Sequence, residues 1–184
     1  MRALSILLAV TIGAIPALAD EATVGLDRVA LIIPPYEDLP HYSSRIAIYF
    51  TLPEQVSDRE IIYAELFIPL DLGGVEILGD SLLDMEAYDI TSEWSEDNVS
   101  WDSPWSEPGG DIDSLSSYAY TITLQQSEDI HMDIRRFVRS IVDGDVVNHG
   151  LMLIPLKYDQ PAFHFHRNID SYIRNSTQVR ITYK

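Results

Sequence analysis

The sequence predicts an all-β fold: an antiparallel, jelly-roll-like sandwich of two sheets with one short covering helix. Many short segments alternate apolar and polar residues, and clusters of Pro, Gly, Asn and Asp separate them. One segment instead repeats apolar residues at helical spacing. This combination is typical of a two-sheet antiparallel architecture. The chain has 184 residues and no repeat or flexible linker, so we expect one domain over residues 20–184.

Residues 1–19 are predicted to be a secretory signal peptide. Arg2 supplies a positive charge, and an apolar run of about fifteen residues follows, shorter than the roughly 20 that span a bilayer. Ala17, Leu18 and Ala19 form the small-x-small pattern that signal peptidase accepts. We therefore expect a secreted protein that does not insert into the membrane. The absence of cysteine favours a prokaryotic source, with periplasmic, extracellular and cell-surface locations all left open.

Most of the predicted strands lie in the last two thirds of the chain. In the first of them, Ile46, Ile48 and Phe50 share one face, because side chains alternate across a strand. The segment Leu151–Leu156 is apolar on both faces, which predicts a central strand that is covered twice. The predicted strands span residues 45–52, 63–70, 82–90, 118–124, 151–156 and 178–183.

The predicted helix begins after Asp133, which can cap its first turn, and ends at Gly144. Its apolar stripe is formed by Ile134, Phe137, Val138 and Ile141. We expect this stripe to cover one end or edge of the sandwich. Three arginines then face outward as a cationic cluster in an acidic protein, namely Arg135, Arg136 and Arg139.

Three stretches resemble the DNRLRE domain family, also classed as carbohydrate-binding module family 96. Residues 62–66 (IYAEL) are similar to its A-x-L strand, and residues 94–101 (WSEDNVSW) are similar to its tryptophan signature. Residues 148–151 (NHGL) are similar to its late N-x-G-[LI] strand. The motif positions here are Trp94, Glu96, Trp101, Asn148 and Gly150.

The resemblance begins at about Arg45, and residues 20–44 lack the opening motif of the family. The helix and the NHGL stretch are also similar to the transforming-growth-factor-β propeptide. The resemblance implies a jelly-roll-like domain of secreted or surface proteins, often linked to polysaccharide. Some family members bind acidic glycans such as alginate, whereas many have no known ligand.

Aromatic residues are the first candidates for glycan contact. Trp105 is expected to be exposed, because it lies beside the loop Pro108-Gly109-Gly110. Trp94 and Trp101 are instead expected to pack beneath their loop as structural anchors. Tyr36 and Tyr42 lie in a Pro-rich loop, where they could contact a glycan or cover the core edge.

The sequence contains histidine and acidic residues that could bind a metal ion. His164 and His166 alternate with two phenylalanines, so they would share one face of a strand and could bind a metal with further ligands. Arg167 beside them could bind an acidic sugar. The acidic segments 80–86, 93–97 and 111–113 could bind a structural calcium ion, or remain unliganded.

Charge and motifs together favour a binding module over an enzyme. The net charge of −17 disfavours nucleic acid and anionic membranes as partners. The sequence contains no nucleophile elbow, zinc-protease motif or phosphate loop. The leading hypothesis is a non-catalytic carbohydrate-binding module that uses end loops of the sandwich. The alternative is a structural or adhesive protein of the envelope or extracellular matrix that binds another protein.

Overall fold

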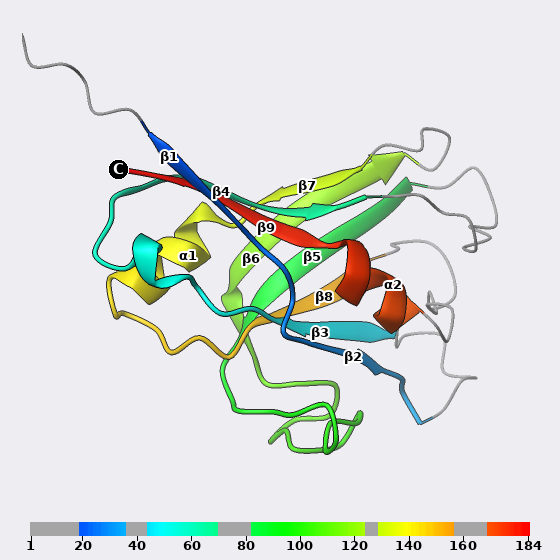
Figure 1. Ribbon diagram of the computed structural model, residues 1–184. Coiled ribbons are helices and arrows are strands. Elements are labelled where there is room, and N and C mark those ends of the chain that lie inside the picture. The colour runs from blue at the N-terminus through cyan, green and yellow to red at the C-terminus, as the bar shows by residue number, and fades with distance from the viewer. Residues whose placement is uncertain (1–18, 36–43, 70–81, 124–128, 157–168) are drawn as a thin grey trace, which may run out of the picture.

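The computed structural model describes residues 19–35, 44–69, 82–123, 129–156 and 169–184. These residues form two antiparallel sheets that face each other, which confirms the predicted sandwich (Figure 1). The four-stranded sheet has the order β1 (Asp20–Val24), β9 (Gln178–Tyr183), β4 (Ile61–Ile68) and β7 (Ile130–Asp133). The five-stranded sheet has the order β2 (Arg28–Ile32), β3 (Arg45–Tyr49), β8 (Leu151–Leu156), β5 (Leu82–Ile90) and β6 (Ile112–Thr123).

The strand order is that of a jelly roll with one additional edge strand. From β3 onward the chain alternates between the two sheets, except that β5 and β6 pair as neighbours. The orders β1-β9-β4-β7 and β3-β8-β5-β6 therefore make the two halves of the roll, and β2 extends the second half. This topology brings segments far apart in the sequence into contact.

The main core lies between the sheets and follows the alternation of side chains along each strand. Ile46 and Ile48 of β3 and Leu151 and Leu153 of β8 point into it. Met152 of β8 points to the opposite face, into a second cluster under the segment that joins β5 to β6. The prediction that Leu151–Leu156 is a central strand covered on both faces is therefore confirmed.

The predicted helix is confirmed as α1 (Arg135–Val142), where Phe137 and Val138 are buried. The Phe137 ring meets Phe50 edge-on, with 6.0 Å between ring centroids. Oδ1 of Asp133 accepts a hydrogen bond from the Arg135 amide at 2.9 Å, so Asp133 satisfies a free amide of the first turn. Gly144 follows the helix with a φ of 76°, as expected for a residue that ends a helix.

The prediction of one covering helix is wrong, because a second α-helix, α2 (Ile169–Ser176), precedes β9. A one-turn 3-10 helix, η1 (Glu54–Val56), also precedes β4. Only Ile173 of α2 is buried among the side chains described there, and Tyr172 is partly buried against the core, so the apolar stripe of this helix is shorter than that of α1. Figure 1 places α1 and α2 at opposite ends of the sandwich. No helix in the described part of the chain reaches the length and apolar character that a membrane span needs.

Candidate ligand-binding site

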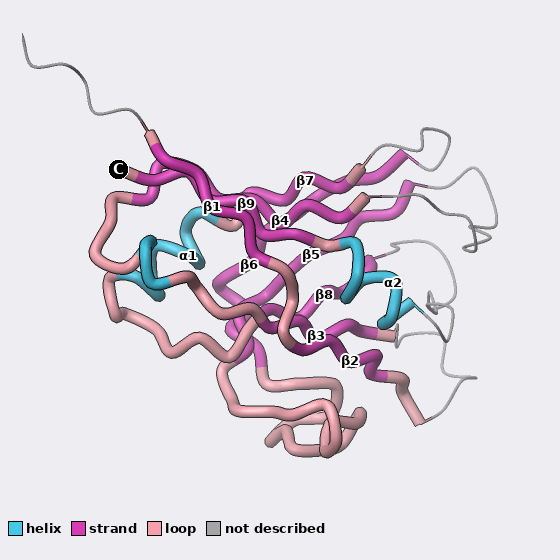
Figure 2. Tube along the Cα trace, in the orientation of Figure 1, coloured by secondary structure: helices cyan, strands magenta, loops and turns pink. Residues whose placement is uncertain are grey.

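The segment of residues 91–111, here called the tryptophan loop, covers the outer face of the five-stranded sheet. Figure 2 shows it as the long pink segment below that sheet. Trp94, Trp101 and Trp105 are only 2%, 7% and 7% exposed, and they pack with Met152 in the second apolar cluster. The expected exposure of Trp105 is therefore wrong. Its indole Nε1 donates to the Ser100 carbonyl at 2.8 Å and so holds the ring inside the loop.

The other two tryptophans anchor this loop, as predicted. Nε1 of Trp94 donates to the His149 carbonyl at 2.8 Å. The Arg45 guanidinium lies 5.0 Å from the Trp101 ring centroid and donates to the Gly109 carbonyl at 2.7 Å. Burial lowers the pKa of Arg45. Because their rings are buried, the tryptophans stabilise the loop and do not offer a stacking surface to a sugar.

Glu96 joins the tryptophan loop to the edge strand β2. Its Oε1 accepts a hydrogen bond from the Val29 amide at 2.6 Å and also pairs with Arg174 of α2. Arg174 further donates to the carbonyls of Asp27 at 3.1 Å and Val29 at 3.3 Å. Burial opposes ionisation of Glu96, but its bonds from Arg174 and the Val29 amide outweigh that effect and lower its pKa. The pair therefore covers the outer edge of β2.

Asn148 and Gly150 hold the start of β8 against the preceding strands. The Asn148 amide Nδ2 donates to the Phe50 carbonyl at 2.8 Å, and its Oδ1 accepts from the Gly150 amide at 3.0 Å. Gly150 has a φ of 92°, and a Cβ there would lie 2.0 Å from the Ile48 carbonyl oxygen. All five motif positions of the resemblance thus have structural contacts.

Several predicted site residues lie outside the described part of the chain. They are Tyr36, Tyr42, His164, His166 and Arg167. Of the proposed calcium ligands, Asp111 already accepts hydrogen bonds from the Ser106 amide, the Ser106 hydroxyl and the Glu107 amide, at 2.7–3.1 Å. The described residues contain no group of three or more acidic or histidine side chains placed to hold a metal ion.

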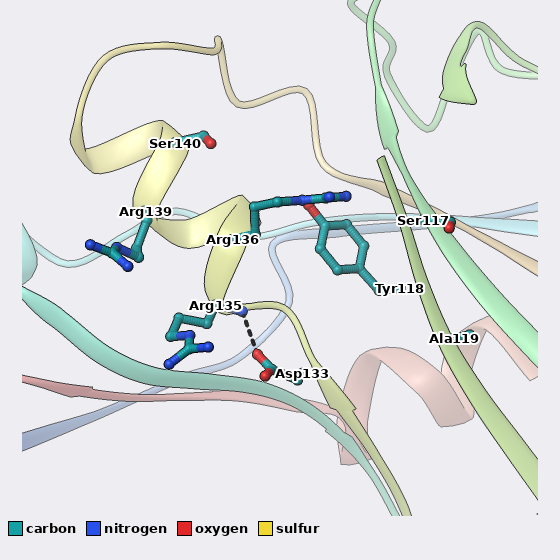
Figure 3. Close-up of a pocket in the computed structure, with 8 residues that line it drawn as sticks. All are labelled: Ser117, Tyr118, Ala119, Asp133, Arg135, Arg136, Arg139 and Ser140. Atoms are coloured by element: carbon teal, nitrogen blue, oxygen red, sulfur yellow. Dashed lines mark hydrogen bonds between the residues drawn. The ribbon is translucent and has the colours of Figure 1, made fainter. Parts of the chain in front are cut away.

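A polar hollow between α1 and the strands β6 and β7 is the candidate site (Figure 3). We call it the arginine hollow. It has a volume of about 570 Å³, within the usual range for small-ligand sites. Its lining residues are Ser117, Tyr118, Ala119, Asp133, Arg135, Arg136, Arg139 and Ser140.

The three arginines of the hollow are exposed, and none forms a salt bridge with a described residue. Arg135 donates to the Ile62 carbonyl at 3.3 Å. Arg136 reaches toward Tyr118, with its guanidinium carbon 5.0 Å from the ring centroid, whereas Arg135 and Arg139 point away from that ring (Figure 3). Their positive charge is thus available to an anion from solvent.

The lining of the hollow contains the buried phenol of Tyr118, and the carboxyl group of Asp89, which does not line the hollow, lies beside that phenol. Tyr118 is 7% exposed, and its hydroxyl interacts with Arg136 on one side and Asp89 of β5 on the other. The Tyr118 Oη and the Asp89 Oδ1 are buried atoms without a hydrogen-bond partner in the described part of the chain. Burial raises the pKa of Tyr118 to about 12, so its hydroxyl remains protonated.

A second charged cluster lies on the opposite, four-stranded sheet. Oε2 of Glu65 accepts a hydrogen bond from the Tyr63 hydroxyl at 2.9 Å and lies 3.1 Å from Nδ1 of His131. Its Oε1 accepts from Arg180 at 3.2 Å. Burial opposes ionisation of Glu65, but these partners outweigh it and lower its pKa. This carboxylate is fully satisfied within the sheet, so the cluster stabilises strand pairing.

The cationic cluster of the helix was visible in the sequence, but the rest of the hollow was not. Tyr118 shows there only as an alternating strand residue, and Asp89 has no local pattern around it. Only the jelly-roll topology places β6 beside α1. No family model matches the sequence, and no curated protein matches it. The resemblance to the DNRLRE family therefore stays a prediction.

Proposed function

We propose that this protein is a non-catalytic secreted binding module that holds an acidic polysaccharide or surface glycan in the arginine hollow. The observation that carries the proposal is the set of three exposed arginines on α1 that line the hollow, none of which is in a salt bridge with a described carboxylate. The site replaces the end-loop site expected around Trp105, because that ring is buried.

The chemistry of the hollow favours a carboxylate or sulfate ester on the ligand. Guanidinium groups donate paired hydrogen bonds to planar oxyanions, and such charge-assisted bonds are stronger than neutral ones. Ser117 and Ser140 supply hydroxyl groups to the same lining, which suit the hydroxyls of a sugar ring. A hollow lined by three arginines and two serines is therefore better matched to a charged glycan than to an apolar ligand.

The overall negative charge of the protein limits where an acidic ligand can bind. With a net charge of −17, the surface as a whole repels polyanions. The arginines engaged elsewhere, such as Arg174 and Arg180, are paired with Glu96 and Glu65. An acidic chain must therefore be recognised locally, and the arginine hollow offers three guanidinium groups that no salt bridge with a described residue neutralises.

Affinity electrophoresis of the chain without residues 1–19 tests this proposal. Neutral, uronic-acid and sulfated polysaccharides are compared, each with and without calcium. We expect retardation by acidic polymers, and we expect the combined substitution R135Q/R136Q/R139Q to weaken it at least about tenfold, since each guanidinium contact contributes roughly 1 kcal/mol. The control is Arg59→Gln, which removes an exposed positive charge outside the hollow.

Two outcomes would contradict the proposal. The first is retardation that is the same in the triple variant and in wild type, which would place binding elsewhere. The second is no retardation by any polymer, which would favour the alternative of a structural or adhesive protein that binds another protein. Loss of retardation in R59Q equal to that in the triple variant would indicate non-specific charge attraction.

A further inference from the structure

One carboxylate lies among the arginines of the hollow. Of the described residues in the lining, only Asp133 has an acidic side chain. It is the last residue of β7 and pairs in register with Glu65 of β4. Its Oδ1 accepts the hydrogen bond from the Arg135 amide at 2.9 Å, which is drawn dashed in Figure 3. The strand pairing of Asp133 and this bond therefore fix its carboxylate at the start of α1.

Asp133 is exposed, and the arginines around it do not neutralise it. It forms no salt bridge with a described residue, although three guanidinium groups share the same lining. Arg135 donates instead to the Ile62 carbonyl at 3.3 Å, and Arg136 extends toward the Tyr118 ring (Figure 3). The second carboxylate oxygen of Asp133, Oδ2, has no hydrogen-bond partner among the described residues. It is therefore available to accept a hydrogen bond from a ligand.

The lining thus combines groups that complement both parts of a sugar acid. A guanidinium group only donates hydrogen bonds, which suits an acidic group, whereas a carboxylate only accepts them, which suits a hydroxyl. A bond from a hydroxyl to an ionised carboxylate is charge-assisted and is stronger than a neutral one. A polyanion without hydroxyls makes no such bond to Asp133 and is repelled by its charge.

We propose that Asp133 is a specificity-determining residue whose Oδ2 accepts a hydrogen bond from a hydroxyl of the sugar unit that the arginines hold by its acidic group. This inference rests on the proposed function of the arginine hollow. It narrows the ligand class from polyanions in general to hydroxylated sugar acids. The arginines supply the attraction for the charge, and Asp133 distinguishes a sugar from a plain anion.

The Asp133→Asn variant tests the inference. Asn also caps helices through its side-chain oxygen, so this variant keeps the bond to the Arg135 amide and replaces the second oxygen with a donor. Dissociation constants are measured at neutral pH for polygalacturonate and for polyacrylate, since both carry carboxylates but only polygalacturonate has hydroxyls. Dextran sulfate and polyvinyl sulfate provide the same comparison for sulfate groups.

The quantity that decides is the preference for the hydroxylated polymer, expressed as the ratio of the two dissociation constants in each pair. We expect this preference to fall about tenfold in D133N, as for the loss of one hydrogen bond to a charged group. The matched control is Asp145→Asn, an exposed carboxylate in the turn that follows α1 and outside the lining of the hollow. We expect D145N to keep the wild-type preference.

A second variant keeps the test independent of the folding of D133N. Asp133→Ser also leaves a side chain that caps helices, and it removes the second oxygen without adding a donor amide. We expect the same fall in preference for D133S. Retained binding of polyacrylate or polyvinyl sulfate shows that the hollow of each variant is folded.

The outcomes separate this inference from the proposed function. Polymer binding that R135Q/R136Q/R139Q abolishes, with an unchanged preference in D133N and D133S, would leave the glycan site standing and overturn the role of Asp133. Equal falls in D133N and D145N would show that net charge alone sets the preference, which also overturns that role. If wild type bound none of the four polymers, the proposed function would be rejected, and the inference with it.

Discussion

Gly150 and Gly144 both have a positive φ, but only Gly150 lies against another strand. A Cβ on Gly150 would lie 2.0 Å from the Ile48 carbonyl oxygen, whereas nothing lies within 4 Å of a Cβ on Gly144. We expect Gly150→Ala to lower the free energy of unfolding by more than about 3 kcal/mol, because backbone atoms would have to move apart. Gly144→Ala should cost about 1–2 kcal/mol, the strain of a positive φ alone.

Urea denaturation with linear extrapolation measures both losses. Equal losses in the two variants would show that the close approach of Gly150 to β3 adds nothing to its positive φ.

At this scale the sequence resemblance selected residues that matter for folding. Trp94, Trp101, Asn148 and Gly150 all hold backbone or core together. Their common role explains why such a motif alone does not identify a ligand.

At the scale of elements, the edge strand β2 depends on two side chains from distant segments. Glu96 accepts from the Val29 amide, and Arg174 donates to the Val29 carbonyl, so both outward groups of that residue are occupied. We expect Glu96→Ala to lower the free energy of unfolding by about 1 kcal/mol, and to promote self-association through the uncovered edge. Asp97→Ala, an exposed neighbour in the same loop, is the matched control.

Urea denaturation measures the first effect, and sedimentation velocity measures the second. A fully monomeric Glu96→Ala protein with wild-type stability would show that α2 covers β2 without Glu96. The same result for both variants would assign any change to the loss of loop charge. Sheet edges protected in this way are a general requirement, since an open edge can pair with another chain.

The elements also show what the sequence could predict and what it could not. Buried strands such as β8 and the inward faces of β3 and β4 follow simple apolar patterns, and they were predicted. The unpredicted strands β1, β2 and β7 are all edge strands, which each pair with one neighbour. They have only four or five residues each, so their patterns are too short to stand out in the sequence. The helix α2 was also missed, because it has only eight residues and few of them are apolar.

At the scale of the whole molecule, the candidate site depends on topology. Tyr118 and Arg136 come from β6 and α1, and the roll brings them together in the arginine hollow (Figure 3). Trp105 shows that the complete fold also determines which side chains are buried. A position next to Pro and Gly residues predicted exposure, yet the second apolar cluster outside the five-stranded sheet buries the ring. The apolar run of β8 indicates that both faces of its sheet are covered, but which segment covers the outer face depends on the complete fold.

The net charge of −17 makes the stability and the proposed binding respond oppositely to salt. Self-repulsion destabilises a compact acidic protein, and salt screens it, since the Debye length falls to a few Å near 1 M. Between about 0.02 M and about 0.5 M sodium chloride we expect the Tm to rise by about 2–4 °C for each kcal/mol of repulsion screened. Over the same range, affinity for dextran sulfate should fall, because the arginine contacts are exposed.

The R135Q/R136Q/R139Q variant should keep the rise in Tm and lose the binding. A Tm that falls with salt would show that attractive ion pairs dominate the acidic surface, and salt-independent binding of dextran sulfate would mean that the arginine hollow does not hold it.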